Sequence, residues 1–418
     1  MPNALRFLRM VRHVPLTQLL ARARLMAQRR AEISLPFIRK SKSRRQTMAL
    51  SADPLGPIFP ARTGRIVLTG DHAVFRFLGT EETSPIPIDW RPRKFQKGTR
   101  LWLLNLHYME YLEELDDSQF LRIILDWIDQ TPPWQPGFWR DNWNSFSLSI
   151  RVVVWMQQLV LRGLATSAPE RVIESLRQQL LFLERHLETD IGGNHLMKNI
   201  KALLWAGRFF TGPEAARMHS SGEALLRKEL GQQIHGDGMH FELTPAYHRQ
   251  VFADLLEMRT VLTDRPLQSA LEEVLESMAE ALVHLTHPDG ELAQFGDTAM
   301  DSDYPVELLL KHWHSPGPAL NGAWELPSGG FAGFRSDSQY FIIRTGKIAA
   351  DELPAHAHGD NGSFEWSVDG HRIIVDAGVY EYDPGERRRW SRSTEAHNTV
   401  TVNGADQAEF WGSFRVGR

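Results

Sequence analysis

The chain has 418 residues, of which 42% are hydrophobic and 23% charged. This is enough apolar surface for more than one core, and it excludes a largely disordered protein. The 47 Lys and Arg are balanced by 51 Asp and Glu, giving a formal net charge of −4, which argues against nucleic acid as a partner. The chain contains no cysteine, so disulfides and thiolate metal sites are excluded, and any metal must bind histidine and carboxylate side chains.

The first 65 residues are predicted to form a basic helix followed by a linker. Up to Ile38, arginine interrupts the apolar residues every few positions, so we expect neither a signal peptide nor a transmembrane segment. Residues 39–65 are rich in Ser, Arg, Pro and Gly, which is typical of a linker. The amphipathic start can form a solvated helical face or contact anionic lipid.

Helical periodicity dominates from about Leu101 to Trp313. Breakers such as Thr131-Pro132-Pro133 and Gly236-Asp237-Gly238 separate the helices without leaving room for strands. We therefore predict an all-helical domain of helical hairpins over residues 66–326. Its expected helices are 111–128, 146–164, 169–187, 195–210, 222–230, 247–262 and 267–285.

The hydrophobic pattern changes to a period of two after Pro327-Ser328-Gly329-Gly330, which indicates a mainly antiparallel β domain over residues 327–418. Asp369-Gly370 is a hairpin signal between two of the runs. The sequence ends at 411–418 in what reads as a continuing strand, so we expect the β domain to be incomplete at its C-terminal end. The expected strands are 331–335, 339–344, 362–368, 372–375 and 398–402.

The strongest local signal is the pair His356 and His358, because residues two apart point to the same face of an extended segment. Asp376 closes an apolar strand, and His397 precedes another predicted strand. Two histidines and an aspartate suit zinc. Hydrogen-bonding loop histidines and a turn aspartate explain the same residues equally well.

Two helix starts carry further candidates. Asn194 and His195 follow Gly192-Gly193 at the start of a helical run, where backbone donors and the helix dipole favour an anion. Asn194 as an ordinary helix cap is an equal alternative. Tyr247 and His248 lie just after Pro245, which is typical of a first helical turn. Tyr247 is then either exposed in a cleft or packed in the core.

These motifs occur in a fixed order across a helical and then a β region. The order resembles the heparinase II/III-like family of polysaccharide lyases over about residues 95–418. The resemblance implies an incomplete (α/α) toroid followed by an antiparallel β-sandwich domain. It also implies cleavage of a uronic-acid-containing polysaccharide by β-elimination. The motifs are Asn194-His195, Tyr247-His248, His356-Ala357-His358, Asp376 and His397-Asn398.

The resemblance also implies roles for the site residues. Asn194 and His195 would bind the uronate carboxylate and stabilise the enolate that develops from it. Tyr247 would be the general acid. His356, as a neutral imidazole, would be the second proton-transfer group, and the choice of base between these two depends on the substrate epimer. Structural zinc would be the cofactor, and its implied ligands are His358, Asp376 and His397.

The first hundred residues, with Trp90 and the run 101–108, resemble relatives associated with bacterial exopolysaccharide or capsule production. The expected partner is therefore an acidic polysaccharide, either of this kind or glycosaminoglycan-like. The lack of a signal peptide predicts a cytoplasmic protein, whereas such a substrate would suit the periplasm or cell envelope. The oligomeric state is undefined by sequence.

Two other functional classes are compatible with the sequence. A glycoside hydrolase would need two carboxylates beside the scissile bond. Glu242 and Asp297 are candidates for them that nothing in the sequence connects. A noncatalytic polysaccharide-binding or assembly protein is the third possibility, although Asn194, Tyr247 and His356 argue for catalysis.

Overall fold

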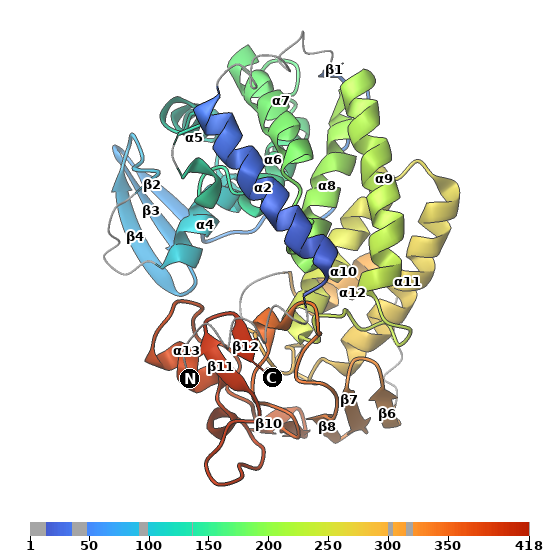
Figure 1. Cartoon of the computed structure of the whole chain (residues 1–418). Coiled ribbons are helices and arrows are strands. Elements are labelled where there is room, and N and C mark those ends of the chain that lie inside the picture. The colour runs from blue at the N-terminus through green and yellow to red at the C-terminus, as the bar shows by residue number, and fades with distance from the viewer. Residues whose placement is uncertain are drawn as a thin grey trace. The chain divides into compact units, whose positions relative to one another are not determined.

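The structure is a computed structural model that describes residues 14–35, 48–91, 99–135, 137–299, 304–314 and 321–417. The chain divides into two compact units (Figure 1). The helical unit comprises residues 20–226. The second unit, which we call the site unit, comprises residues 227–418 and the start of the chain up to Leu19. No helix among the described residues is both long and apolar enough to cross a membrane.

The helical unit confirms most of the predicted helices. The helix α6 is buried along most of its length and packs against α4, α7 and α8. The range predicted as one helix over 111–128 is broken, because Asp116 caps a new helix through a capping box with Gln119. The elements are α2 (Leu16–Ser34), α4 (Arg100–Tyr108), η1 (Glu110–Glu114), α5 (Asp117–Gln130), η2 (Phe138–Arg140), α6 (Ser145–Leu161), α7 (Glu170–Arg185), α8 (Gly193–Phe209) and α9 (Pro213–Gln233).

The predicted basic helix is confirmed from Leu16 onward as α2, while residues 1–13 and 36–47, which include the first part of the predicted linker, lie outside the described part of the chain. Within the helical unit, α2 lies against the end of α7. Glu32 on α2 is buried and pairs with His186 at an Oε2–Nε2 distance of 2.9 Å. The helix is therefore attached to the unit through this polar contact as well as through Leu25, which is also buried.

The helical unit also contains strands that the sequence pattern did not lead us to expect. Residues 66–85 form an antiparallel sheet in the order β2-β3-β4, and a two-residue pair joins β1 to β5. Phe75 and Phe77 of β3 are buried against Trp102 and Tyr111. The strands are β1 (Ala49–Leu50), β2 (Ile66–Thr69), β3 (His72–Phe77), β4 (Thr80–Pro85) and β5 (Phe210–Thr211).

A cluster of charges ties this sheet to η1. Glu110 binds Arg62 at 2.5 Å and Arg65 at 2.7 Å, one arginine on each carboxylate oxygen. Glu113 binds Arg62 at 2.5 Å, and Glu114 accepts hydrogen bonds from the backbone N–H groups of residues 64–66. The first strand of the sheet is thus held by the carboxylates of a single short turn.

The site unit begins with helices and continues into antiparallel strands. Its helices are α10 (Pro245–Val261), α11 (Arg265–His284) and α12 (Val306–Trp313), and α10 packs on α11. A five-stranded antiparallel sheet follows in the order β10-β9-β8-β7-β6. Its strands are β6 (Gly322–Leu326), β7 (Phe331–Arg335), β8 (Gln339–Arg344), β9 (Phe364–Val368) and β10 (His371–Ile374).

The change from a helix-rich region to antiparallel sheet is confirmed, with the first strand, β6, starting before residue 327. The predicted hairpin at Asp369-Gly370 is also confirmed, because both residues have the positive φ angles, 47° and 79°, of a tight turn between β9 and β10.

The strand predicted over 398–402 is wrong. These residues are irregular, and the Asn398 side chain donates instead to the carbonyls of Phe364 and Val375. Residues 409–417 form a hairpin of β11 (Glu409–Gly412) and β12 (Arg415–Gly417). The remaining elements are η3 (Pro354–His356), α13 (Glu386–Arg392) and η4 (Thr394–Ala396).

Candidate active site

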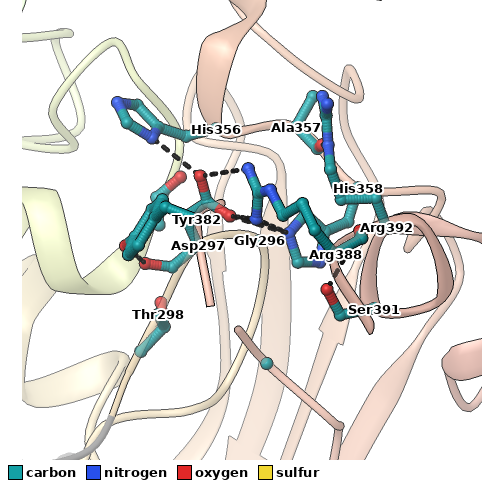
Figure 2. Close-up of polar contacts among 12 residues, drawn as sticks. Gly296, Asp297, Thr298, His356, Ala357, His358, Tyr382, Arg388, Ser391 and Arg392 are labelled. Atoms are coloured by element: carbon teal, nitrogen blue, oxygen red, sulfur yellow. Dashed lines mark hydrogen bonds and ion pairs between the residues drawn. The ribbon is translucent and has the colours of Figure 1, made fainter. Parts of the chain in front are cut away.

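Asp297, in the loop after α11, is the centre of a buried polar cluster in the site unit (Figure 2). Its Oδ2 atom contacts Nδ1 of His356 at 2.9 Å, and its Oδ1 atom contacts Nε2 of His358 at 2.9 Å. Both terminal nitrogens of Arg388 donate to the same carboxylate. Burial alone would raise the pKa of Asp297, but Arg388 and the two histidines hold it well below its usual value. The carboxylate is therefore ionised.

His356 lies between two carboxylates. While Nδ1 faces Asp297, Nε2 is 3.1 Å from Oε2 of Glu242. Burial would lower the pKa of His356, but the bonds to Asp297 and Glu242 raise it to about 9. The imidazole is consequently favoured as a cation at neutral pH, which differs from the neutral group expected from sequence. Its side chain is 10% exposed.

Tyr247 stacks on this imidazole. It is the third residue of α10, which starts at Pro245 as predicted. The ring centroids of Tyr247 and His356 are 3.8 Å apart, with the planes tilted by 30°. Burial raises the pKa of Tyr247 well above 10, and the nearby Tyr382, Asp297 and Glu242 raise it further. The phenol therefore keeps its proton at neutral pH.

The neighbour of Tyr247 has a structural role. His248 is buried, and its Nε2 atom is 2.9 Å from the carbonyl oxygen of Met278. This contact links α10 to α11 within the site unit. The stacking on His356 makes Tyr247, rather than His248, the candidate for chemistry.

The three residues expected to bind zinc lie in one neighbourhood. Nδ1 of His397 is 2.7 Å from Oδ1 of Asp376, and the rings of His358 and His397 are 5.3 Å apart. In the part of the chain that the structure describes, no three or more His, Asp or Glu side chains are arranged to hold a metal ion. However, Nδ1 of His358 and Nε2 of His397 are buried without a hydrogen-bond partner among the described residues. The donor chemistry thus fits a metal, although the present arrangement does not form a complete site.

Asn194 and His195 belong to the helical unit. They are the second and third residues of α8, at the helix N-terminus as predicted. The cap of this helix is Gly192, with a φ of 72° and no side-chain capping bond, so the interpretation of Asn194 as the cap is wrong. The side chain of Asn194 is buried, whereas His195 is 33% exposed and contacts Glu188 at 3.1 Å.

Three residues of the cluster had no assigned role in the predicted lyase site. Glu242 and Asp297 were candidates only for a hydrolase, and the structure now connects them through His356. No sequence pattern identified Arg388, because it lies in a short helix without apolar periodicity. Gly296 permits the close approach, since it has a φ of 56° and a Cβ there would lie 2.9 Å from the carbonyl oxygen of His356.

Comparison with known proteins identifies the family. Residues 104–318 match the heparinase II/III N-terminus, and residues 318–418 match the heparinase II/III-like C-terminal region. This division agrees with a helix-rich part followed by antiparallel sheets. The chain belongs to the heparinase II/III family.

The curated relatives are longer proteins. The chain is 28% identical over 391 residues to a heparin-sulfate lyase of Bacteroides stercoris, covering 77% of this chain and 57% of that protein. It is 27% identical over 261 residues to the heparin-sulfate lyase of Pedobacter heparinus, covering 55% of this chain and 39% of that protein. The chain therefore spans less than two thirds of each of these relatives.

Solved structures support the same fold. A crystal structure of heparinase III matches with a TM-score of 0.65 at 19% identity, covering 78% of this chain and 60% of that one. A mutant of the heparan sulfate lyase from Pedobacter heparinus matches with a TM-score of 0.52 at 20% identity, covering 79% and 59%. The shared property at these identities is the fold.

Proposed function

We propose that the protein is a polysaccharide lyase that cleaves a uronic-acid-containing polysaccharide by β-elimination. The observation that carries this proposal is the stacked pair of Tyr247 and His356, with the imidazole held between Glu242 and Asp297. Two groups that can transfer protons thus lie in contact, and both are partly accessible. The family membership and the heparin-sulfate lyase relatives support the same reaction class.

In this reaction the C5–H bond of the uronate breaks and its electrons form the C4=C5 double bond. The C4–O bond breaks, and its electron pair leaves on the oxygen. Tyr247 is suited to protonate that oxygen, because its phenol is neutral. The positive charge favoured on His356 stabilises negative charge developing beside it. The C5 proton needs a free acceptor: His356 takes it in the neutral form of its imidazole, or Tyr247 takes it as its own proton passes to the leaving oxygen. Which of these two groups does so depends on the uronate epimer.

Asn194 and His195 are the proposed carboxylate-binding residues. The N-terminus of α8 carries backbone donors and a positive dipole end, which favour an anion. Neutralising the uronate carboxylate makes the C5 proton more acidic, because the developing enolate charge spreads into that group. We also propose that residues 66–326 form the incomplete (α/α) toroid and residues 327–418 the sandwich domain of the family. A bacterial exopolysaccharide is our proposed source of the substrate.

A structural zinc ion is part of the proposal. His358 through Nδ1 and His397 through Nε2 have the unpartnered nitrogens, and Asp376 is the third proposed ligand. Burial lowers the pKa of His358, which favours the neutral form that binds metals, whereas Asp376 outweighs burial and raises the pKa of His397. Zinc supplies a fixed positive centre that would hold the loop carrying His356.

The arrangement argues against a hydrolase. Such an enzyme needs one protonated and one free carboxylate beside the scissile bond. Glu242 and Asp297 instead hold the same imidazole, and Asp297 is ionised and bound by Arg388. Both carboxylates are therefore engaged with protein side chains.

The test is ultraviolet absorbance during incubation with alginate, glycosaminoglycans and bacterial exopolysaccharides. Elimination leaves a conjugated unsaturated uronate that absorbs, whereas hydrolysis does not. A rise in absorbance with one polymer supports the lyase and defines its substrate class. Chain shortening without absorbance would identify a hydrolase, and binding without either change would identify a noncatalytic protein.

A further inference from the structure

The carboxylate of Asp297 is held from several sides at once. Oδ1 accepts hydrogen bonds from His358 and from one terminal nitrogen of Arg388. Oδ2 accepts hydrogen bonds from His356 and from the other terminal nitrogen of Arg388. The bidentate guanidinium fixes the plane of the carboxylate, because both oxygens must lie opposite the two nitrogens. A rotation of this group would therefore disturb both histidine rings together.

Arg388 is itself fixed. It lies on α13, is fully buried, and donates through Nε and Nη2 to the carbonyl oxygen of Ser413 at 3.1 and 2.8 Å. Arg392, one turn further along α13, is also buried and donates to the same carbonyl at 3.0 Å. Its other bonds go to the carbonyls of Ala357 and Gly412. Of these two arginines, only Arg388 has a hydrogen bond to Asp297.

We propose that Asp297 and Arg388 form a positioning pair, in which one clamped carboxylate sets the ring orientations of both His356 and His358. The proton-transfer imidazole and the imidazole on the metal side would then be aligned by the same group. The catalytic consequence rests on the proposed lyase function. The alignment itself is a property of the folded chain and can be measured without turnover.

The experiment compares three variants, D297N, R388K and R392K. Asn has one acceptor oxygen, so D297N removes one of the two histidine bonds. Lys keeps the charge of Arg388 but cannot bind both oxygens. R392K is the matched control, because it changes a buried arginine of the same helix that shares the carbonyl of Ser413 but does not bind Asp297. Thermal unfolding reports whether each variant folds. If D297N does not fold, the proposal is tested with R388K alone.

The first readout is the set of imidazole N–H resonances in protein labelled with ¹⁵N-histidine, assigned by replacing His356 or His358 singly with Gln. We expect D297N and R388K to shift the resonances of both histidines strongly, and R392K to shift them much less, because Arg392 bonds the backbone carbonyl of Ala357 and not Asp297. Movement of only one histidine, or an equal response to R392K, would overturn the shared positioning. This readout applies even if the wild-type protein cleaves no tested polysaccharide.

The second readout is the division of the effect between kcat and KM on the polymer that gives absorbance. Misplacing a reacting group costs about 100-fold in rate, so D297N should lower kcat by about that factor. R388K should lower kcat about 10-fold, and R392K should stay within a factor of about two. KM should change by less than about threefold for all three. A loss confined to KM would contradict the proposal, and an inactive wild type would instead contradict the proposed function.

Discussion

Two partly or fully buried carboxylates, Glu110 in the helical unit and Asp297 in the site unit, are each held by several cationic side chains. Arginines hold Glu110, and they keep their charge at every ordinary pH. Asp297 has one arginine and two histidines, a residue type that can gain and lose a proton. The side chains around a buried carboxylate therefore decide its role in the protein. A carboxylate among arginines links structural elements, whereas one among histidines can direct proton transfer.

The largest effect on catalytic activity is expected from substitution of Tyr247 in the site unit. Y247F removes the proton that the site unit is proposed to donate and should lower kcat about 1000-fold, with little change in polysaccharide binding. Absorbance kinetics and a binding assay measure the two effects. Y340F is the control, because the buried hydroxyl of Tyr340 donates to the carbonyl of His284 at 2.7 Å. That variant should lose stability and keep its activity, and retention of full activity in Y247F would remove Tyr247 from the mechanism.

The next prediction concerns the proposed zinc ion and its ligand His358, one of the two histidines that contact Asp297. We expect H358A to lose about one zinc per chain and to lower the unfolding midpoint by roughly 5–10 °C. Elemental analysis and thermal unfolding measure these changes. H287A is the matched control, because both nitrogens of buried His287 already have partners, Ser367 and Glu365, each at 2.7 Å. It should lower stability without loss of metal, and a metal-free wild type would refute the zinc proposal.

The contribution of Glu110 to the stability of the protein should decrease at acid pH. Burial would raise the pKa of Glu110, but Arg62 and Arg65 lower it to about 2. Its stabilisation is therefore fully present above the unfolded value near 4.5 and is lost as pH falls toward 2. We expect E110Q to cost about 3 kcal/mol at pH 7 and progressively less below pH 4.5.

Urea unfolding between pH 7 and pH 3 measures the difference between E110Q and the wild type. D117N is the control, because Asp117 is 61% exposed opposite Arg162. Such surface pairs contribute about 0.5 kcal/mol or less. A difference for E110Q that stays constant with pH would show that the lost contacts, and not the charge, determine its stability.

The smallest expected effect on stability comes from an uncharged helix cap in the helical unit. Asn144 caps α6 by accepting hydrogen bonds from the N–H groups of Phe146 and Ser147 at 3.1 and 3.4 Å. N144A should cost about 1 kcal/mol, and N144S should recover most of it. Because no charge is involved, the cost should be the same at pH 7 and pH 5. A strong pH dependence would mean that Asn144 is coupled to an ionised group.

Much of the fold was predictable because the helices have long apolar periods and clear breakers. The ranges of α6, α7, α8, α10 and α11 agree with the predictions to within a few residues. The sheet of residues 66–85 was missed although β3 has a buried alternating face. The predicted strand at 398–402 has the right alternation but no neighbouring strand, and Val400 and Val402 are exposed. Alternation shows that a segment can pair and not that a partner exists.

The candidate site was predictable where a motif is local. Tyr247 was identified by the helix start beside it, and His356 and His358 by their spacing, which brings both to one carboxylate. Arg388 could not be found in this way, because its link to Asp297 spans 91 residues. Local patterns identify side chains that react, whereas the groups that orient them depend on contacts that form only in the folded chain.

The separation of these residues along the chain has a consequence for folding order. Asp297 binds partners that follow it by 59, 61 and 91 residues, whereas the arginines of Glu110 precede it by 48 and 45. During synthesis, Glu110 finds both arginines already made, but Asp297 must wait for α13. Closing several long loops is slow, so we expect amides of α13 to gain protection from hydrogen exchange after those of η1 in a pulse-labelling experiment. The cluster around Asp297 would then be among the last parts of the chain to become ordered.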